Sequence, residues 1–376
     1  MKQPIPGTRR QLARNRQAWQ ALLERPRFEI IPLPGVAERL TYLPAGTKVT
    51  VTASPRHGVE ATVGLAESLA KSGFDAVPHL AARQFTDEEL TDALHRLHAA
   101  GVRDLFVVGG DSPPPEVRRL GPLHGVAGMP SGDAPPQEVR RLGPLHGVAG
   151  IGERGTSESA GRGEVPIDGP PRAGVFPDGL SLLKAIDASP YRFDEIGVPS
   201  YPEGHPNIDD DTLWSTLVAK QDYATYTVTQ MCFDADLVRR FAIDARAHGV
   251  TLPIIAGIPG AVAAAKLLRV SFRIGVGDSV RFVRRHRAVA RRLLRPHSYR
   301  PDALLRKLVA ATSDDAAVAD EGQGRRHRRP ATTRSPLVAG LHIYTFNEIA
   351  PTVRWLEQRR RSLSSGEEVA ADDHAV

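Results

Sequence analysis

The segment Tyr201–Pro206 (YPEGHP) combines two prolines with a cluster of polar and aromatic side chains. It brings a phenol, a carboxylate and an imidazole together, shortly after an apolar run at Ile196–Val198. Proline fixes its own φ and disfavours helical geometry in the residue before it, so the segment should leave a strand as a rigid, extended chain. Such a cluster can form one wall of a binding site, although taken alone it also fits a surface turn.

Other residues that could take part in chemistry stand within or just after further apolar runs. Glu29 lies among Phe28, Ile30 and Ile31. Apolar surroundings favour a protonated carboxyl group and so suit Glu29 to general-acid catalysis. Gly109 and Gly110 precede Asp111, and two glycines let the backbone approach a flat ligand closely. The remaining polar residues at or near run ends are Thr52, His79, Gln230, Tyr344 and Thr345.

Short apolar runs that alternate mostly with helical patterns must position these residues. The predicted strands are Phe28–Ile31, Lys48–Thr52, Asp75–Pro78, Asp104–Val108, Glu195–Ser200, Tyr226–Gln230, Leu252–Ala256 and Leu341–Thr345. The predicted helices are Glu60–Lys71, Asp87–Ala99, Gly179–Ile186, Asp209–Lys220, Asp234–His248, Ala261–Leu268, Ser279–Leu294, Pro301–Ala311 and Asn347–Arg359.

Strand–helix alternation indicates an α/β protein with a parallel sheet, and eight repeats favour a closed (β/α)₈ TIM barrel over an open doubly wound sheet. In a barrel the carboxyl ends of the strands meet on one face, where active sites of this fold lie. The polar strand ends are therefore predicted to converge on one site.

Residues 112–175 interrupt the alternation. Gly110–Gly128 recurs almost unchanged as Gly132–Gly150, and the residues that follow are rich in Gly, Arg, Pro and Ser. This near-identity indicates either a recent tandem duplication or a sequence artefact. We predict a single barrel domain over 1–360 with a long disordered insertion at 112–175 after the fourth strand, a flexible loop at 314–336 and a disordered tail at 361–376.

The composition narrows the class of protein further. The single cysteine, Cys232, excludes an internal disulfide and a cysteine-based zinc cluster, so we expect a cytoplasmic protein and predict no metal site. Residues 1–24 lack the apolar segment of a secretory signal, and no apolar run approaches the ~20 residues that span a bilayer. We therefore expect no membrane partner.

Arginine accounts for most of the net charge of +6 and is concentrated in residues 269–307 and 325–329. Such patches can bind nucleic acid. Within 279–295, however, apolar and basic residues occupy separate stripes, which is typical of an amphipathic helix packed on the protein. We favour this second interpretation and expect no nucleic-acid partner.

Eight of these segments together resemble the methylenetetrahydrofolate reductase family. They occur in the family's order and cover most of residues 28–111 and 176–358. The segments are Phe28–Pro32, Val49–Thr52, Val77–Leu80, Gly110–Asp111, Tyr201–Pro206, Thr229–Asp234, Ile254–Ile258 and His342–Asn347.

The resemblance implies a TIM barrel that reduces 5,10-methylenetetrahydrofolate to 5-methyltetrahydrofolate with NAD(P)H and FAD, in one-carbon and methionine metabolism. Glu29 matches the family's general acid, which helps to open the five-membered ring of the folate. Asp111 matches a carboxylate that stabilises the resulting iminium cation. Gln230 and Tyr344 match positions expected to bind the folate substrate. The positions expected to bind the cofactor are Thr52, His79, Gly110, Tyr201, His205 and Lys220.

Four positions depart from the pattern of flavin-using members. Gly109 and Ala219 stand where those members carry basic residues, and Leu213 and Thr216 stand where polar contacts are expected. Losing guanidinium groups removes charge-assisted hydrogen bonds to a pyrophosphate, so we predict weak or absent FAD binding. Direct hydride transfer from a nicotinamide is then an alternative. A further alternative is a catalytically inactive barrel that binds folate or a partner. The choice between NADH and NADPH and the oligomeric state stay open.

Overall fold

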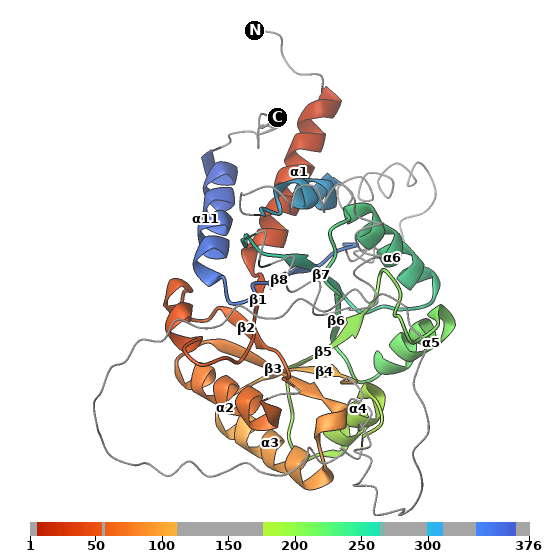
Figure 1. Ribbon diagram of the computed structural model, residues 1–376. Coiled ribbons are helices and arrows are strands. Elements are labelled where there is room, and N and C mark those ends of the chain that lie inside the picture. Colours follow the sequence, from red (N-terminus) through yellow and green to blue (C-terminus); the bar gives the residue numbers. More distant parts are fainter. Residues whose placement is uncertain are drawn as a thin grey trace, which may run out of the picture. The chain divides into compact units, whose positions relative to one another are not determined.

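Eight parallel strands close into a barrel in sequence order, with β8 paired to β1 (Figure 1). This confirms the predicted TIM barrel. The strands are β1 (Arg27–Ile30), β2 (Lys48–Val51), β3 (Asp75–Ala81), β4 (Asp104–Val108), β5 (Glu195–Ser200), β6 (Tyr226–Thr229), β7 (Ile254–Pro259) and β8 (Gly340–Tyr344).

The computed structural model describes residues 6–54, 57–110, 176–263, 266, 299–310 and 336–365, with the backbone alone described at 6–14 and 365. These residues belong to one compact unit, formed by Met1–Ser112 and Arg172–Val376. The insertion predicted at 112–175, the loop predicted at 314–336 except its last residue, the arginine-rich helix predicted at 279–295 and Asp111 lie outside the described residues.

Helices follow most of the strands. They are α2 (Gly58–Lys71), α3 (Asp87–Ala99), α4 (Gly179–Ala188), α5 (Asp210–Lys220), α6 (Ala235–Ala247) and α11 (Ile349–Ser365), with residues 302–310 also helical and short 3₁₀ helices at η1 (Ala37–Tyr42) and η2 (Ala82–Gln84). Thr86 and Glu89 form a capping box at the start of α3, and Asp209 caps α5. These caps satisfy backbone N–H groups that have no partner within the helix.

Several details of the predicted elements were wrong. The helix predicted at 261–268 does not begin there, since Val262 instead forms an isolated bridge with Tyr299. Helix α11 continues to Ser365, so the disordered tail predicted from residue 361 does not start there. Helix α1 (Pro6–Glu24) was not predicted, and most of its apolar residues lie in its second half. Its end is held by tertiary contacts, because Arg360 on α11 donates hydrogen bonds to the carbonyl of Leu23.

Alternate residues of each strand face the surrounding helices or the barrel interior. On β1, Phe28 and Ile30 belong to the large core outside the barrel. A second apolar cluster fills the interior and consists of Val77, Phe106, Tyr226, Val228 and Ile255. Gly197 makes room for Tyr226, because a Cβ at Gly197 would lie 2.4 Å from Cζ of that ring. Arg27 enters the interior with its guanidinium 4.4 Å from the centre of the Tyr226 ring.

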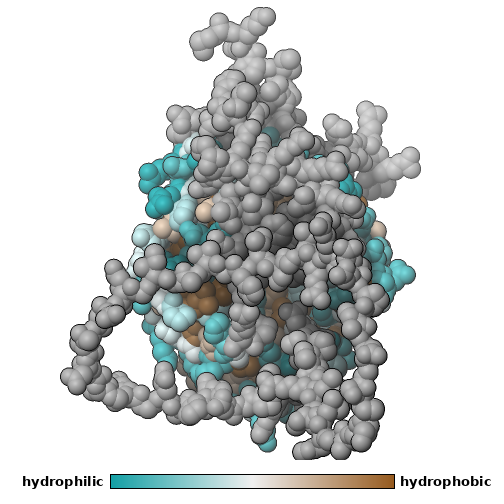
Figure 2. Space-filling model, viewed as in Figure 1, coloured by the Kyte–Doolittle hydropathy of each residue, from teal (hydrophilic) through white to brown (hydrophobic). Residues whose placement is uncertain are grey.

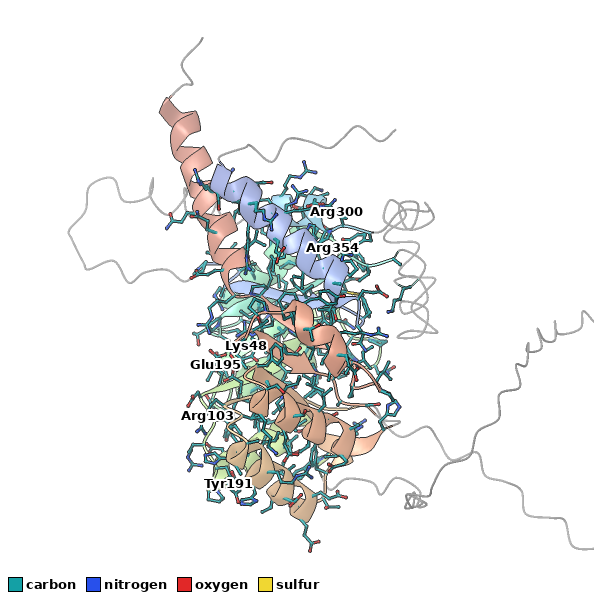
Figure 3. The ribbon with its side chains drawn as sticks, turned by 90° about the vertical axis from the view of Figure 1, so that its left-hand side faces the viewer. Lys48, Arg103, Tyr191, Glu195, Arg300 and Arg354 are labelled. Carbon is teal, nitrogen blue, oxygen red and sulfur yellow. The ribbon has the colours of Figure 1, made fainter. Side chains whose placement is uncertain are left out.

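The amino ends of the strands hold an ionic cluster. The ammonium group of Lys48 on β2 forms salt bridges with Asp75, Asp104 and Glu195, which begin β3, β4 and β5. In Figure 3, Lys48, Arg103 and Glu195 lie along one side of the barrel. The carboxyl ends of the strands therefore lie on the opposite side, where the fold predicts the site.

Candidate active site

A cavity of about 1240 Å³ lies beyond the carboxyl ends of β4 and β5. Its walls come from the residues after these strands, the start of α4 and the facing sides of α5 and α6. Four of the predicted cofactor-binding residues line it: Gly110, Tyr201, His205 and Lys220. On the face viewed in Figure 2, hydrophobic side chains among the described residues gather toward the middle, with hydrophilic ones around the edge.

The segment Tyr201–His205 forms a turn, and the predicted extended exit from β5 was wrong. The N–H of Gly204 donates to the carbonyl of Tyr201 at 3.0 Å, and Pro202 occupies the second position of this turn, where proline is favoured. Gly204 has a φ of +77°, which glycine adopts without steric cost. The rings of Tyr201 and His205 meet edge to face, 5.1 Å apart. Both rings therefore form one wall of the cavity.

Lys220 lies at the end of α5 and is buried, with 9% of its surface exposed. A Cβ at Gly179, the first residue of α4, would lie 3.5 Å from its Nζ. Burial lowers the pKa of Lys220, and the charge of Asp178 partly opposes this effect. Lys220 forms no salt bridge with a described residue. A buried ammonium group beside a helix N-terminus is a suitable environment for an anion such as a phosphate.

Glu29 lies in the barrel interior beside two imidazoles and does not line the cavity. Its Oε2 is 3.0 Å from Nε2 of His342 on β8 and 4.0 Å from Nε2 of His79 on β3. His79 was predicted to follow β3 but lies within it and is buried. Burial lowers the pKa of His79 to about 4, against a smaller opposing effect of Glu29. His79 is therefore a neutral neighbour of the carboxyl group at neutral pH.

Tyr344 on β8 is the register partner of Glu29 on β1. Burial raises its pKa well above the usual value, with further contributions from the charges of Glu29 and Tyr201. Its hydroxyl group donates to the carbonyl of Thr229 at 3.3 Å. The hydroxyl group is thereby held at the end of β6, next to Gln230 in the sequence.

Two further predicted residues follow their strands without lining the cavity. Gln230 comes directly after β6 with an exposed side chain, and its N–H donates to the carbonyl of Ser200 at 2.8 Å. Thr52 follows β2, and its N–H donates to the carbonyl of Ile30 at 3.0 Å. Both backbones are therefore held by the neighbouring strand.

His342, the neighbour of Glu29, was not among the predicted site residues. It stands two residues before Tyr344, so strand periodicity places both side chains on the same face of β8. That periodicity is the feature of the sequence that could have pointed to His342. The distance to Glu29 followed only from the pairing of β8 with β1.

The cavity fits the pyrophosphate of a resident FAD poorly. Gly109, Leu213 and Thr216, which replace basic or polar residues of flavin-using members, all line its walls, whereas Ala219 does not. Six carboxylates line the described walls, against the three cations Arg83, Lys220 and Arg240. Asp178 and Asp209 are also already engaged in capping helices. A pyrophosphate would meet few of the charge-assisted donors that usually retain one.

The chain is similar in sequence to known proteins. A family model described as methylenetetrahydrofolate reductase matches residues 160–275. "Probable methylenetetrahydrofolate reductase (NADH)" of Oryza sativa subsp. japonica is 32% identical over 97 residues, which are 23% of this chain and 16% of that protein. "Probable methylenetetrahydrofolate reductase (NADPH)" of Caenorhabditis elegans is 35% identical over 83 residues, which are 21% of this chain and 12% of that protein. The chain therefore matches less than a fifth of the length of these relatives.

A solved structure shares the fold. An uncharacterised protein from Clostridium thermocellum, described as binding two copies of 5-methyl-5,6,7,8-tetrahydrofolic acid, superposes with a TM-score of 0.50. It is 9% identical and the superposition covers 91% of this chain and 98% of that one. The family match, the similar relatives and the closed barrel together support membership of the methylenetetrahydrofolate reductase family.

Proposed function

We propose that this protein reduces 5,10-methylenetetrahydrofolate to 5-methyltetrahydrofolate at the carboxyl end of the barrel. The observation that carries the proposal is the position of Glu29, which is largely buried in the barrel interior on β1, beside His342 and His79. The fold neighbour from Clostridium thermocellum, described as binding the product of this reaction, supports a folate ligand on such a barrel.

In the proposed reaction Glu29 gives its proton to N10 of the folate. The bond between N10 and the methylene carbon breaks, and the N5 lone pair forms the iminium cation. A hydride then adds to the methylene carbon and yields the N5-methyl group, while Glu29 regains a proton from solvent. Asp111, which follows Gly110 in the segment after β4, is proposed to stabilise the cation. Gln230 and Tyr344 are proposed to contact the folate.

We propose NAD(P)H as the direct hydride donor. A cosubstrate that must leave after each turnover needs only micromolar to millimolar affinity, about 4–8 kcal/mol. Lys220 and the start of α4 can contribute one charge-assisted phosphate contact, worth about 1.5–3 kcal/mol. A contact of this free energy is consistent with transient binding of a nucleotide, but it is too weak to retain a resident flavin. Gly110, Tyr201 and His205 are the further proposed cofactor contacts in the cavity, with Thr52 and His79 at the strands beside it.

No described helix has both the length and the hydropathy to cross a bilayer. The single cysteine is buried. A chain with one cysteine forms no internal disulfide, which fits our proposal that the protein acts in the reducing cytoplasm.

The test is an assay of methylenetetrahydrofolate-dependent oxidation of NADH and of NADPH, together with an absorption spectrum of the purified protein. We expect turnover without a flavin band. Glu29→Gln should lower kcat by about a hundredfold or more, as loss of a general acid does. Glu38→Gln, at an exposed position in η1, is the matched control and should keep the full rate.

Three outcomes would contradict the proposal. An unchanged rate in Glu29→Gln would show that Glu29 is not the general acid. A stoichiometric flavin band would show that the cavity retains FAD and contradict the direct transfer. Folate binding without any reduction by either nucleotide would favour the inactive folate-binding barrel instead.

A further inference from the structure

The two oxygens of the Glu29 carboxyl group have unequal surroundings. Nε2 of His342 lies 3.0 Å from Oε2, and Nε2 of His79 lies 4.0 Å from the same oxygen. Among the described residues, none forms a hydrogen bond with Oε1. Both imidazoles therefore approach one oxygen and leave the other to a ligand.

The surroundings of His342 select one tautomer of its ring. The side chain is 1% exposed, and its Nδ1 is buried without a hydrogen-bond partner among the described residues. An N–H group at Nδ1 would be a buried donor without an acceptor, which is unfavourable. An N–H group at Nε2 finds Oε2 of Glu29 as its acceptor. The tautomer with the proton on Nε2 forms one more hydrogen bond and leaves no orphan donor.

The strands hold the two side chains in this arrangement. In the β1–β8 ladder Arg27 pairs with His342, and Glu29 pairs with Tyr344. One residue further, the hydroxyl group of Thr345 donates to the carbonyl of Glu29 at 2.6 Å. The backbone of Glu29 is thereby tied to the residue that follows β8, the strand that carries His342.

We propose that His342 is a positioning residue that donates to Oε2 of Glu29 and so confines the acid proton to Oε1, the oxygen that faces the substrate. This inference rests on the proposed role of Glu29 as the general acid. With the donor in place, the protonated carboxyl group presents a single O–H in one orientation. Without it, the proton could occupy either oxygen, and only one of the two arrangements would be productive.

Three titratable groups of the described residues face Glu29: His79 on β3, and His342 and Tyr344 on β8. Burial lowers the pKa of His79 to about 4 and raises the pKa of Tyr344 well above its usual value. Both groups are therefore neutral near pH 7. A change in the kinetic pH profile of a His342 variant can then be assigned to the interaction between His342 and Glu29.

The experiment compares His342→Gln with His342→Leu. The amide nitrogen of glutamine can reach about the position of Nε2 and keep the donor, whereas leucine supplies none. We expect His342→Leu to lower kcat by about 10–100-fold, as loss of a charge-assisted hydrogen bond does, with KM for the folate changed less than about threefold. The alkaline limb of its kcat–pH profile should move to higher pH, because the carboxylate form of Glu29 loses its donor. His342→Gln should restore both the rate and the profile.

Two kinetic results would overturn the proposal. One is a wild-type rate and pH profile in His342→Leu. The other is a loss in His342→Gln as large as that in His342→Leu, which would indicate a packing role alone. Folate binding, followed by the fluorescence of Trp214 in the cavity wall, reports whether each variant retains its site.

A second measurement needs no activity. Two-bond ¹H–¹⁵N correlation spectra of histidine-labelled protein distinguish the two tautomers, and the signals absent from His342→Gln identify residue 342. We expect the Nε2–H tautomer. An Nδ1–H tautomer would refute the hydrogen bond even if the enzyme were active. If the wild type reduces no folate, the proposed function and the acid role of Glu29 fail, whereas the tautomer still decides whether His342 donates to Oε2.

Discussion

The ammonium group of Lys48 on β2 lies 2.8 Å from Oε2 of Glu195 on β5, across the amino end of the barrel (Figure 3). Burial lowers the pKa of Lys48, but hydrogen bonds with Asp104 and Glu195 outweigh this effect and leave the pKa above its usual value. At Asp104, burial dominates and raises the pKa of the carboxyl group despite its contact with Lys48. One lysine thus compensates several carboxylates at the ends of three strands.

Lys48→Met should therefore destabilise the protein by about 3 kcal/mol at pH 7.5, because Asp104 and Glu195 lose their shared cation while buried or half-buried. The loss should be smaller near pH 5, since the raised pKa of Asp104 lets it become neutral. Urea unfolding at both pH values measures this. Lys184→Met, at an exposed position on α4, is the control and should change the stability by less than about 0.5 kcal/mol. A loss below about 1 kcal/mol for Lys48→Met would contradict the prediction.

His79 should make the stability depend on pH between its unfolded and folded pKa values. Burial lowers the pKa of His79 from 6.5 to about 4, so the unfolded chain binds an extra proton within this range. Stability from this group is complete above pH 6.5 and is lost as the pH falls toward 4, by on the order of 2–3 kcal/mol. His79→Gln should remove that part of the pH dependence in thermal or urea unfolding. If His79→Gln and the exposed His95→Gln show the same pH dependence, His79 is not buried as a neutral imidazole.

Lys220 should contribute to nucleotide binding. Lys220→Met is expected to weaken NADH or NADPH binding by about 10–100-fold, as loss of one charge-assisted contact does, whereas Lys220→Arg should keep most of the affinity. Because burial lowers the pKa of Lys220, wild-type affinity should fall as the pH rises through that lowered value. Lys220→Arg should not show this decline. Titration of nucleotide against protein fluorescence checks both, and an unchanged Kd in Lys220→Met would place the phosphate elsewhere.

Substitution of Gly110 should lower the activity of the protein as well as its stability. Its φ is +80°, and a Cβ there would lie 3.3 Å from Cβ of Ala81. Gly101 has a similar φ of +85°, but a Cβ there would meet no atom within 4 Å, and Gly101 does not line the cavity. Alanine at either position should cost about 1–2 kcal/mol of stability. Only Gly110→Ala should lower the rate of folate reduction, by about tenfold or more, since it displaces the backbone next to Asp111. Equal rates in the two variants would argue against this role.

Local patterns were sufficient to predict several elements. The strands at Asp104–Val108 and Glu195–Ser200 have the predicted bounds, and so does α3, which Thr86 caps. Each is an apolar or amphipathic run between residues that stop or start regular structure, so the information lies within a few neighbouring residues. Helix α1 was missed because contacts with α11, distant in sequence, stabilise its end.

The sequence by itself determined the alternation that closes an eight-stranded barrel and the polar residues at its strand ends. Only the tertiary structure decided which of those residues line the cavity and which lie inside the barrel. Tyr201, His205 and Lys220 share the cavity, whereas Glu29 lies inside the barrel with His79 and His342. Glu29 and His342 are 313 positions apart and meet because β8 pairs with β1. Strand periodicity specifies which face a side chain occupies, but the distance between two side chains depends on ring closure and register, which no local pattern contains.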